Sequence, residues 1–194
     1  FGLDALSWRY NGNLYMVPTE YENKAVLVNL DLFEAAGLSV PKDDWTWDDV
    51  LDCVKALQEN GCADPLSMDY TDFSVWGAFA MREGGELFRK PDSAEGETCL
   101  NLTDAKVING LRYLAENFIA NGYLAEKTPA EISAEELSQY GMLVISHADL
   151  GKWAAELKKG TMNWEFAHFP RAVAGSDEGF GIGVKTARAI LESV

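Results

Sequence analysis

Three short polar segments of the sequence combine aromatic rings with carboxylates. They span residues 19–23, 69–76 and 147–153, and their candidate ligand-binding side chains are Tyr21, Glu22, Asp72, Phe73, Trp76, Asp149 and Trp153. The face of an aromatic ring packs against the C–H surface of a sugar ring, while carboxylates and amides bond the sugar hydroxyls. These segments therefore favour a binding site for a small polar solute, with carbohydrate as the leading candidate.

The groups that catalysis would need are scarce. The chain has two histidines, and His147 has Asp149 as a neighbour without a further cluster of metal-ligand residues. The sequence has no G-x-S-x-G nucleophile motif, and the glycines at 181 and 183 lack the third glycine of a dinucleotide-binding loop. We therefore predict a binding protein that has no catalytic residue, no metal and no cofactor.

Two alternatives to a binding protein stay open. The chain has 31 acidic residues, so some carboxylates fall close together by chance, and a carbohydrate-active hydrolase with paired carboxylates is one alternative. A structural or adhesion module is the other, and it predicts that no concave site joins aromatic rings to carboxylates.

Composition limits the class of partner. The 194 residues are 47% hydrophobic and 24% charged, which is ordinary for a globular protein. The net charge of −15 repels phosphate backbones and anionic membrane surfaces, so we expect no nucleic-acid partner. The sequence contains no apolar run of the roughly 20 residues that a membrane span needs.

The elements that must position these residues begin in the stretch 10–49. A turn at 11–13 precedes an apolar strand over 14–17, which Pro18 ends, and a second apolar strand covers 25–28 after the polar segment. A short helix over 32–36 ends at Gly37, and Thr46 caps a helix that ends at Gly61.

Helices and strands alternate along the rest of the chain. Helices are expected over 74–83, 104–121 (capped by Thr103), 130–139, 149–159 and from 186 onward, and an exposed hairpin or loop over 86–102. Strands are expected over 65–68, 142–145, 164–169 and 180–184. This alternation predicts an α/β fold with a central sheet.

The order of motifs in residues 11–49 resembles a known family. It reads NG-x-L-Y-x-x-P, a polar segment, an apolar strand ending in Asn, DLF-x-x-AGL, P and TW-D-D. This order resembles the extracytoplasmic solute-binding proteins of ABC importers, family 1, in their sugar-binding branch. The likeness continues through the apolar helix before Gly84–Gly85 to the G-x-G strand at 181–183.

The resemblance implies a fold, a domain organisation and partners. The fold is a periplasmic-binding-protein-like (type II) α/β lobe with a central mixed β-sheet flanked by helices. Residues 1–194 are then one lobe of a two-lobe, hinge-closing protein, with a core at 21–184 and overhangs or hinge strands at 1–20 and 185–194. The partners are a small solute, expected to be a sugar, and the permease subunits of an ABC transporter. The location is extracytoplasmic, in the periplasm or as a cell-surface lipoprotein.

The resemblance also ranks the candidate residues. Glu22 stands four residues after Pro18, where the family has a ligand-contacting glutamate, and Asp72 falls near a family ligand carboxylate. Asp149 stands where the family has its sugar-stacking aromatic ring, and Trp153 follows one helical turn later. This departure keeps a cationic solute, such as a polyamine, as an alternative ligand.

Two further expectations concern cysteines and association. A bridge between Cys53 and Cys62 across the end of a helix stays open beside the interpretation of Cys53 as a small buried residue. A single lobe would expose its cleft face and the apolar residues of the overhangs, so self-association is expected. Those residues are Leu3, Leu6, Trp8, Ile190 and Leu191.

Overall fold

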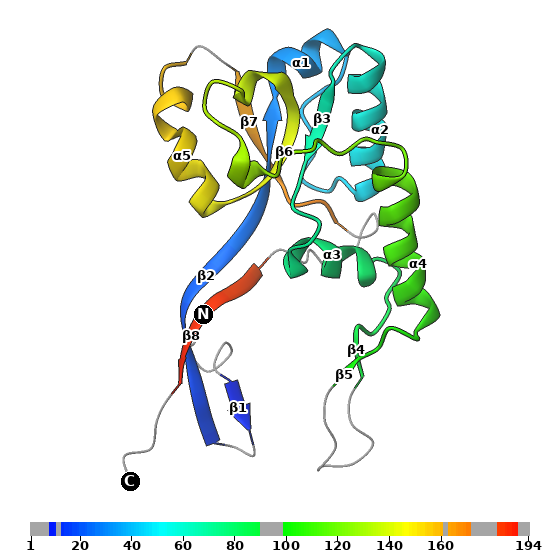
Figure 1. The fold of residues 1–194 in the computed structure, drawn as a ribbon, viewed down its shortest axis with the longest axis vertical. Helices are drawn as coiled ribbons and strands as arrows, with labels where there is room; N and C mark the ends of the chain where they lie inside the picture. The colour runs from blue at the N-terminus through cyan, green and yellow to red at the C-terminus, as the bar shows by residue number, and fades with distance from the viewer. Residues whose placement is uncertain (1–7, 11–12, 90–98, 161–162, 172–181, 190–194) are drawn as a thin grey trace. The chain divides into compact units, whose positions relative to one another are not determined.

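The computed structural model describes residues 8–10, 13–89, 99–160, 163–171 and 182–189 (Figure 1). For residues 8–10, 13–23, 89, 147–148 and 182–189 it describes the backbone alone. The chain divides into two compact units, Phe1–Asn23 with Ile182–Val194 and Lys24–Gly181. The apolar overhang residues predicted to drive self-association have no described side chains.

The first unit is built on the beginning of a long strand. Strand β2 (Asn13–Asn29) pairs antiparallel with β1 (Trp8–Tyr10) and, from Met16 to Asn23, with β8 (Ile182–Ala189). The prediction of two strands separated by a polar segment is therefore wrong, because β2 is continuous. The register shifts on both sides of Glu20, and such an irregularity lets a strand accommodate Pro18, which has no N–H to donate.

The helix predicted from residue 186 onward is also wrong. The chain stays extended through Ala189, and Thr186 to Ala189 pair with residues of β2 from Glu20 back to Met16. The sequence of this segment suits a helix, but ladder hydrogen bonds to a neighbouring strand outweigh a local propensity of a few tenths of a kcal/mol per residue.

The second unit contains a mixed sheet with the strand order β7–β2–β6–β3. Residues 24–29 of β2 pair antiparallel with β6 (Tyr140–Ser146) on one side and with β7 (Trp164–His168) on the other. Strand β3 (Asp64–Ser67) pairs parallel with β6. Helices cover both faces, which confirms the predicted fold class of a central mixed sheet flanked by helices.

The two faces of this sheet belong to separate cores. One core contains Val26, Val28, Met142 and Val144, and the other contains Leu27, Leu143 and Ile145. Successive strand residues point to opposite faces, so an unbroken apolar run is expected in a strand that is covered on both sides. The sheet is therefore the middle layer of three.

Each face has its own helices (Figure 1). The first core is covered by α1 (Leu30–Ala35), α2 (Trp47–Glu59), α3 (Phe73–Ala80) and α4 (Ala105–Leu114). The second is covered by α5 (His147–Leu157) and two 3₁₀ turns, Pro129–Glu131 and Leu137–Gln139. No helix within the described ranges is long and apolar enough to cross a membrane.

Capping residues set the ends of the helices. Thr46 and Asp49 form a capping box at the start of α2, which confirms the predicted cap. At α4 the predicted cap Thr103 is wrong, because Asp104 accepts hydrogen bonds from the backbone N–H groups of Lys106 and Val107. This helix ends in a π-helical turn, Ala115–Ile119.

Residues 130–139 do not form the single helix that the sequence predicts. Glu131 caps the Thr128 backbone, and the Glu136 carboxylate accepts the Ser133 N–H and pairs with Lys127. These local bonds stabilise two short turns in place of a continuous helix. The hairpin expected in 86–102 is confirmed by the pairing of β4 (Phe88–Arg89) with β5 (Cys99–Leu100).

Helices α3 and α4 meet at a glycine. A Cβ atom added at Gly110 would lie 1.9 Å from the backbone oxygen of Phe79, so only glycine allows this approach. Gly151 in α5 has no atom within 4 Å of the corresponding position. Gly110 and Gly151 therefore form a matched pair, one at a close crossing and one with open space around it.

We expect Gly110→Ala to lower the free energy of unfolding by about 2–3 kcal/mol, because the helices must separate. Gly151→Ala should raise it by about 0.5–1 kcal/mol, since alanine favours a helix more than glycine does. Urea unfolding followed by tryptophan fluorescence measures both. Equal effects of the two substitutions would contradict the close helix crossing.

Candidate ligand-binding site at the strand ends

The strands β3, β6 and β7 run in one direction and end toward one edge of the sheet. Strand β3 is parallel to β6, and both β6 and β7 are antiparallel to β2. At this edge Ser146 of β6 and His168 of β7 lie opposite Lys24 and Ala25 of β2. In open α/β sheets, ligands bind beyond the carboxyl ends of the strands, so this edge is the candidate site.

Asp72 is held at this edge by two kinds of contact. Its Oδ1 accepts hydrogen bonds from the Ser74 backbone N–H at 2.8 Å and the Ser74 hydroxyl at 2.7 Å, which caps α3. Its Oδ2 lies 2.8 Å from the Lys24 ammonium. A carboxylate has about four lone-pair positions, so these three bonds leave about one for a further donor.

The ion pair is half-enclosed by protein. The side chain of Lys24 is 9% exposed and that of Asp72 is 31% exposed. Burial raises the pKa of the Asp72 carboxyl, but the hydrogen bonds from Lys24 and Ser74 outweigh it, so the pKa lies below the ordinary 3.8. The carboxylate is therefore ionised throughout the neutral range.

Lys24 connects two of the predicted segments and was not among the predicted residues. Its backbone lies opposite Ser146, where the third segment begins, and its side chain reaches Asp72 in the second segment. A single lysine at the head of the apolar run at 25–28 is the sequence signal that could have identified it, since a charge beside a buried strand needs a partner.

Phe73 and Trp76 give the edge an aromatic surface. Phe73 is 40% exposed, and its ring meets Trp76 edge-on with centroids 5.0 Å apart. Trp76 is partly buried against the core, and its contact with Phe73 packs that ring against the protein on one side. The structure therefore places Asp72, Phe73 and Trp76 together at the start of α3.

Asp149 has a structural role at the start of α5. Its Oδ2 accepts hydrogen bonds from the Ser146 backbone N–H at 2.8 Å and the Ser146 hydroxyl at 2.9 Å. With Ser146 as N-cap, this is a capping box. Ser146 is the last residue of β6, so the bonds to Ser146 place the Asp149 carboxylate near this edge of the sheet. These bonds stabilise the start of α5.

Trp153 is a correction to the sequence prediction. Its side chain is 0% exposed, lies in the core beneath α5, and donates its indole N–H to the Ile132 carbonyl at 3.1 Å. A ring without exposed surface cannot stack on a solute, so we remove Trp153 from the candidate site. Trp153 lies on the face of α5 that points to the core, which the helical period of about 3.6 residues explains.

Tyr21 and Glu22 lie in the part of β2 that pairs with β8. Tyr21 is opposite Val184, and Glu22 is opposite Gly183. Their side chains are outside the described part of the structure, so the structure gives their place in the ladder only.

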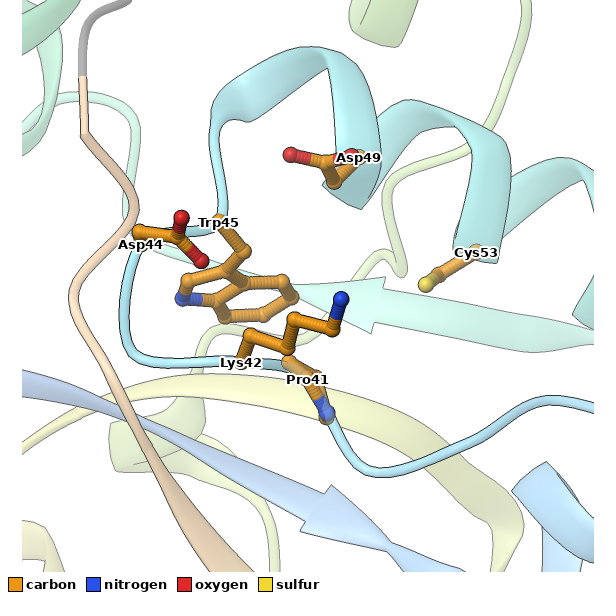
Figure 2. A pocket seen from close by; sticks show the side chains of 6 residues that line it. All are labelled: Pro41, Lys42, Asp44, Trp45, Asp49 and Cys53. Carbon is orange, nitrogen blue, oxygen red and sulfur yellow. The ribbon is translucent and has the colours of Figure 1, made fainter. Parts of the chain in front are cut away.

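A pocket of about 410 Å³ lies beside α2 and contains none of the predicted residues (Figure 2). Its lining consists of Pro41, Lys42, Asp44, Trp45, Asp49 and Cys53. The Trp45 indole N–H donates to the His168 carbonyl at 2.7 Å, which fixes this wall to the end of β7. Burial, with the nearby Asp49 and Asp52, raises the pKa of the Cys53 thiol to about 11, so the pocket holds no reactive thiolate near neutral pH.

The described residues show neither the bridge between Cys53 and Cys62 nor a cluster of metal ligands. Cys53 and Cys62 are both free thiols, so the bridge between them that the sequence left open is absent. Across the described ranges, no three His, Cys, Asp or Glu side chains gather as a metal site.

We expect Asp72→Asn to destabilise the chain by about 1–3 kcal/mol near pH 7, because the charge-assisted contact between its carboxylate and the Lys24 ammonium is lost. Asparagine retains the helix cap, so the loss reports the ion pair. The folded pKa of Asp72 is lowered, so its contribution exists above the ordinary pKa and disappears as the pH falls through the folded value. Urea unfolding at about pH 7 and about pH 3 should therefore show the difference shrinking in acid.

Asp69→Asn is the matched control. Asp69 bonds the backbone and hydroxyl of Thr71 much as Asp72 bonds Ser74, and it has no ion pair among the described residues. Its substitution should change the free energy of unfolding by less than about 0.5 kcal/mol. An equally large loss from Asp69→Asn would show that the effect does not come from the pair with Lys24.

Comparisons with known proteins give the family and the fold. Residues 3–189 match the model of a family described as bacterial extracellular solute-binding proteins. An ABC substrate-binding protein from Listeria monocytogenes, in complex with cycloalternan, is 22% identical with a TM-score of 0.61. An ABC transporter solute-binding protein from Agrobacterium vitis S4, with bound D-mannitol, is 16% identical with a TM-score of 0.62. No curated protein sequence matches the chain.

The two structural matches cover almost all of this chain but only part of the solved chains. They cover 94% and 93% of this chain and 46% and 44% of the two solved chains, so this chain spans less than half their length. Over the matched residues this chain has the fold of the two solute-binding proteins, which confirms the predicted periplasmic-binding-protein-like class. Because the family match extends over almost the whole sequence, the chain belongs to the family of bacterial extracellular solute-binding proteins.

Proposed function

We propose that this chain is one ligand-binding lobe of a receptor that delivers a carbohydrate to an ABC importer. The observation that carries the proposal is the position of an exposed aromatic residue, Phe73, directly after Asp72, whose carboxylate pairs with Lys24 at the strand ends. A ring face and fixed polar groups match the two kinds of surface that a sugar presents. The sugar and the polyol named with the two similar structures support the same ligand class.

The division of the chain supports a lobe with crossing connections. The unit Lys24–Gly181 carries the sheet, both cores and Asp72. The chain enters this unit within β2 and leaves it before β8, so these two crossings are the proposed hinge. Ligands of two-lobe receptors are enclosed by hinge closure, and the other lobe would supply the rest of the site.

The proposed site residues have distinct roles. Phe73, supported by Trp76, offers a ring face, and Asp72 accepts a hydroxyl at its remaining position. Tyr21 and Glu22 of β2 stay in the proposal as a further ring and a hydrogen-bond acceptor for the solute. Asp149 keeps a place at the margin of the site, with its helix-capping bonds intact.

The structure supports a neutral solute more than a cationic one. The carboxylate of Asp72 already holds the ammonium of Lys24 at 2.8 Å. A polyamine ammonium would meet a carboxylate that already has a charged partner, so its electrostatic gain would be smaller than at an unpaired carboxylate. A neutral hydroxyl uses the same remaining lone pair and depends less on that charge.

The proposed partners and location follow from the family. The full-length protein would dock on the permease subunits of an ABC transporter outside the cytoplasm, in the periplasm or as a cell-surface lipoprotein. The lobe alone would self-associate through its uncovered face. Its role is binding without turnover.

The test is titration calorimetry of the full-length protein that carries this lobe, against panels of sugars, polyols, amino acids and polyamines. We expect binding of a carbohydrate, and a loss of affinity of about 10- to 100-fold in Glu22→Gln, because a charged acceptor bonds a hydroxyl more strongly than an amide. Glu59→Gln, at the exposed end of α2, is the control and should leave the affinity unchanged.

Other results would reject the proposal in different ways. Binding of polyamines in place of sugars would select the cationic ligand. Hydrolysis of glycosides that Glu22→Gln or Asp72→Asn abolishes would make the protein an enzyme. Absence of binding to every compound in the four panels would favour a structural or adhesion module.

A further inference from the structure

The aromatic surface at Phe73 continues onto the β4–β5 hairpin. The ring of Phe88 lies beside that of Phe73, with centroids 6.0 Å apart and planes inclined by 53°. Phe88 is 49% exposed and Phe73 is 40% exposed. Two neighbouring rings from separate elements, α3 and the hairpin, therefore share one exposed surface.

The hairpin holds Phe88 in this position through its neighbour. Leu87 is 1% exposed and packs in a small core with Ala80 and Val107, and its carbonyl accepts the Asn101 N–H at 2.8 Å. Leu87 directly precedes β4, so its burial and its hydrogen bond to Asn101 fix the backbone at the start of the strand, from which Phe88 projects to solvent. Leu100, which is opposite Phe88 in the ladder and 47% exposed, continues the apolar surface.

Exposed polar groups lie in the segment that precedes α3 in the chain. Tyr70 is 44% exposed, and the Asp69 carboxylate holds the Thr71 hydroxyl at 2.6 Å. Phe73 follows directly on Asp72, whose carboxylate is part of the proposed sugar site. The rings therefore extend that site along α3 toward the hairpin.

We propose that Phe73 and Phe88 together form a second subsite, which takes the next ring of an oligosaccharide. The inference rests on the proposed function and narrows its ligand to a chain of two or more sugar rings. A single sugar would use Phe73 beside Asp72 and leave Phe88 uncovered. A longer chain covers both rings and removes their apolar surface from water.

The area of the surface favours a small ligand over a protein partner. A whole aromatic side chain buries about 150–250 Å², so two half-exposed rings offer about that area between them, and the half-exposed Leu100 adds less than one further ring. A standard protein interface needs about 800 Å² from each partner. The two rings reach that area only as part of a much larger contact, whereas they suffice for one sugar ring.

The test measures affinity against chain length in the full-length protein. Calorimetry would use glucose, mannose, galactose and xylose, each as a series of one to four linked rings. We expect Phe88→Ala to weaken binding of three- and four-ring members by about tenfold and to leave the single sugar unchanged. Phe88→Trp should keep or strengthen binding of the long members, because its ring also stacks.

Phe166→Ala is the matched control. Phe166 is 53% exposed on β7, and its substitution should leave affinity for every length unchanged. Melting temperatures of all variants would show that each is folded. Since Phe88 is exposed, neither of its variants disturbs the core.

The remaining outcomes separate this inference from the proposed function. Sugar binding with equal loss at every length, or with no loss, in Phe88→Ala overturns the second subsite and leaves the proposed function standing. Normal sugar binding with impaired transport assigns the surface to the permease instead. Absence of binding to any sugar overturns both.

Discussion

The second unit depends on six residues of β2, 24–29, that are hydrogen-bonded on both sides and covered on both faces. Such a strand can have polar side chains only at its ends. At one end Asn29, 3% exposed, accepts two backbone N–H groups of α1 and donates to the carbonyls of Ser138 and Tyr140. At the other end Lys24 holds Asp72. One polar side chain at each end of this strand segment therefore contacts the start of a helix, Asn29 at α1 and Lys24 at α3.

This constraint places the candidate site. The strand pairing fixes the backbone of Lys24, and its ammonium lies 2.8 Å from the carboxylate of Asp72, where α3 begins. The orientation of Phe73 then follows from the helix, since it is the first residue after the cap. The polar and aromatic parts of the proposed site are consequently positioned by the same contact, and a ligand would meet a surface that is already formed. Such preorganisation lowers the entropy that binding must overcome.

Local chemistry could be predicted from the sequence, and long-range pairing could not. The capping box of Thr46 and the apolar run of β2 follow from neighbouring residues, and both are confirmed. The strand at 186–189 depends on a partner far away in the sequence, and local propensity gives the wrong answer there. Asp149 and Trp153 show the same limit at the site, because a carboxylate and a ring also belong to a helix cap and its core face. Lys24 was missed since its partner is distant in sequence.

The net charge of the protein acts differently on cationic and on neutral solutes. The net charge of −15 raises the concentration of cations near the surface and has no effect on a neutral solute. In the proposed site the Lys24 ammonium lies 2.8 Å from the Asp72 carboxylate, so a cationic solute would meet a carboxylate that already has a charged partner. In that proposed site the ring surface of Phe73 and the remaining lone pair of Asp72 would recognise the solute. A sugar would use both, with its C–H face on the ring and a hydroxyl on the carboxylate.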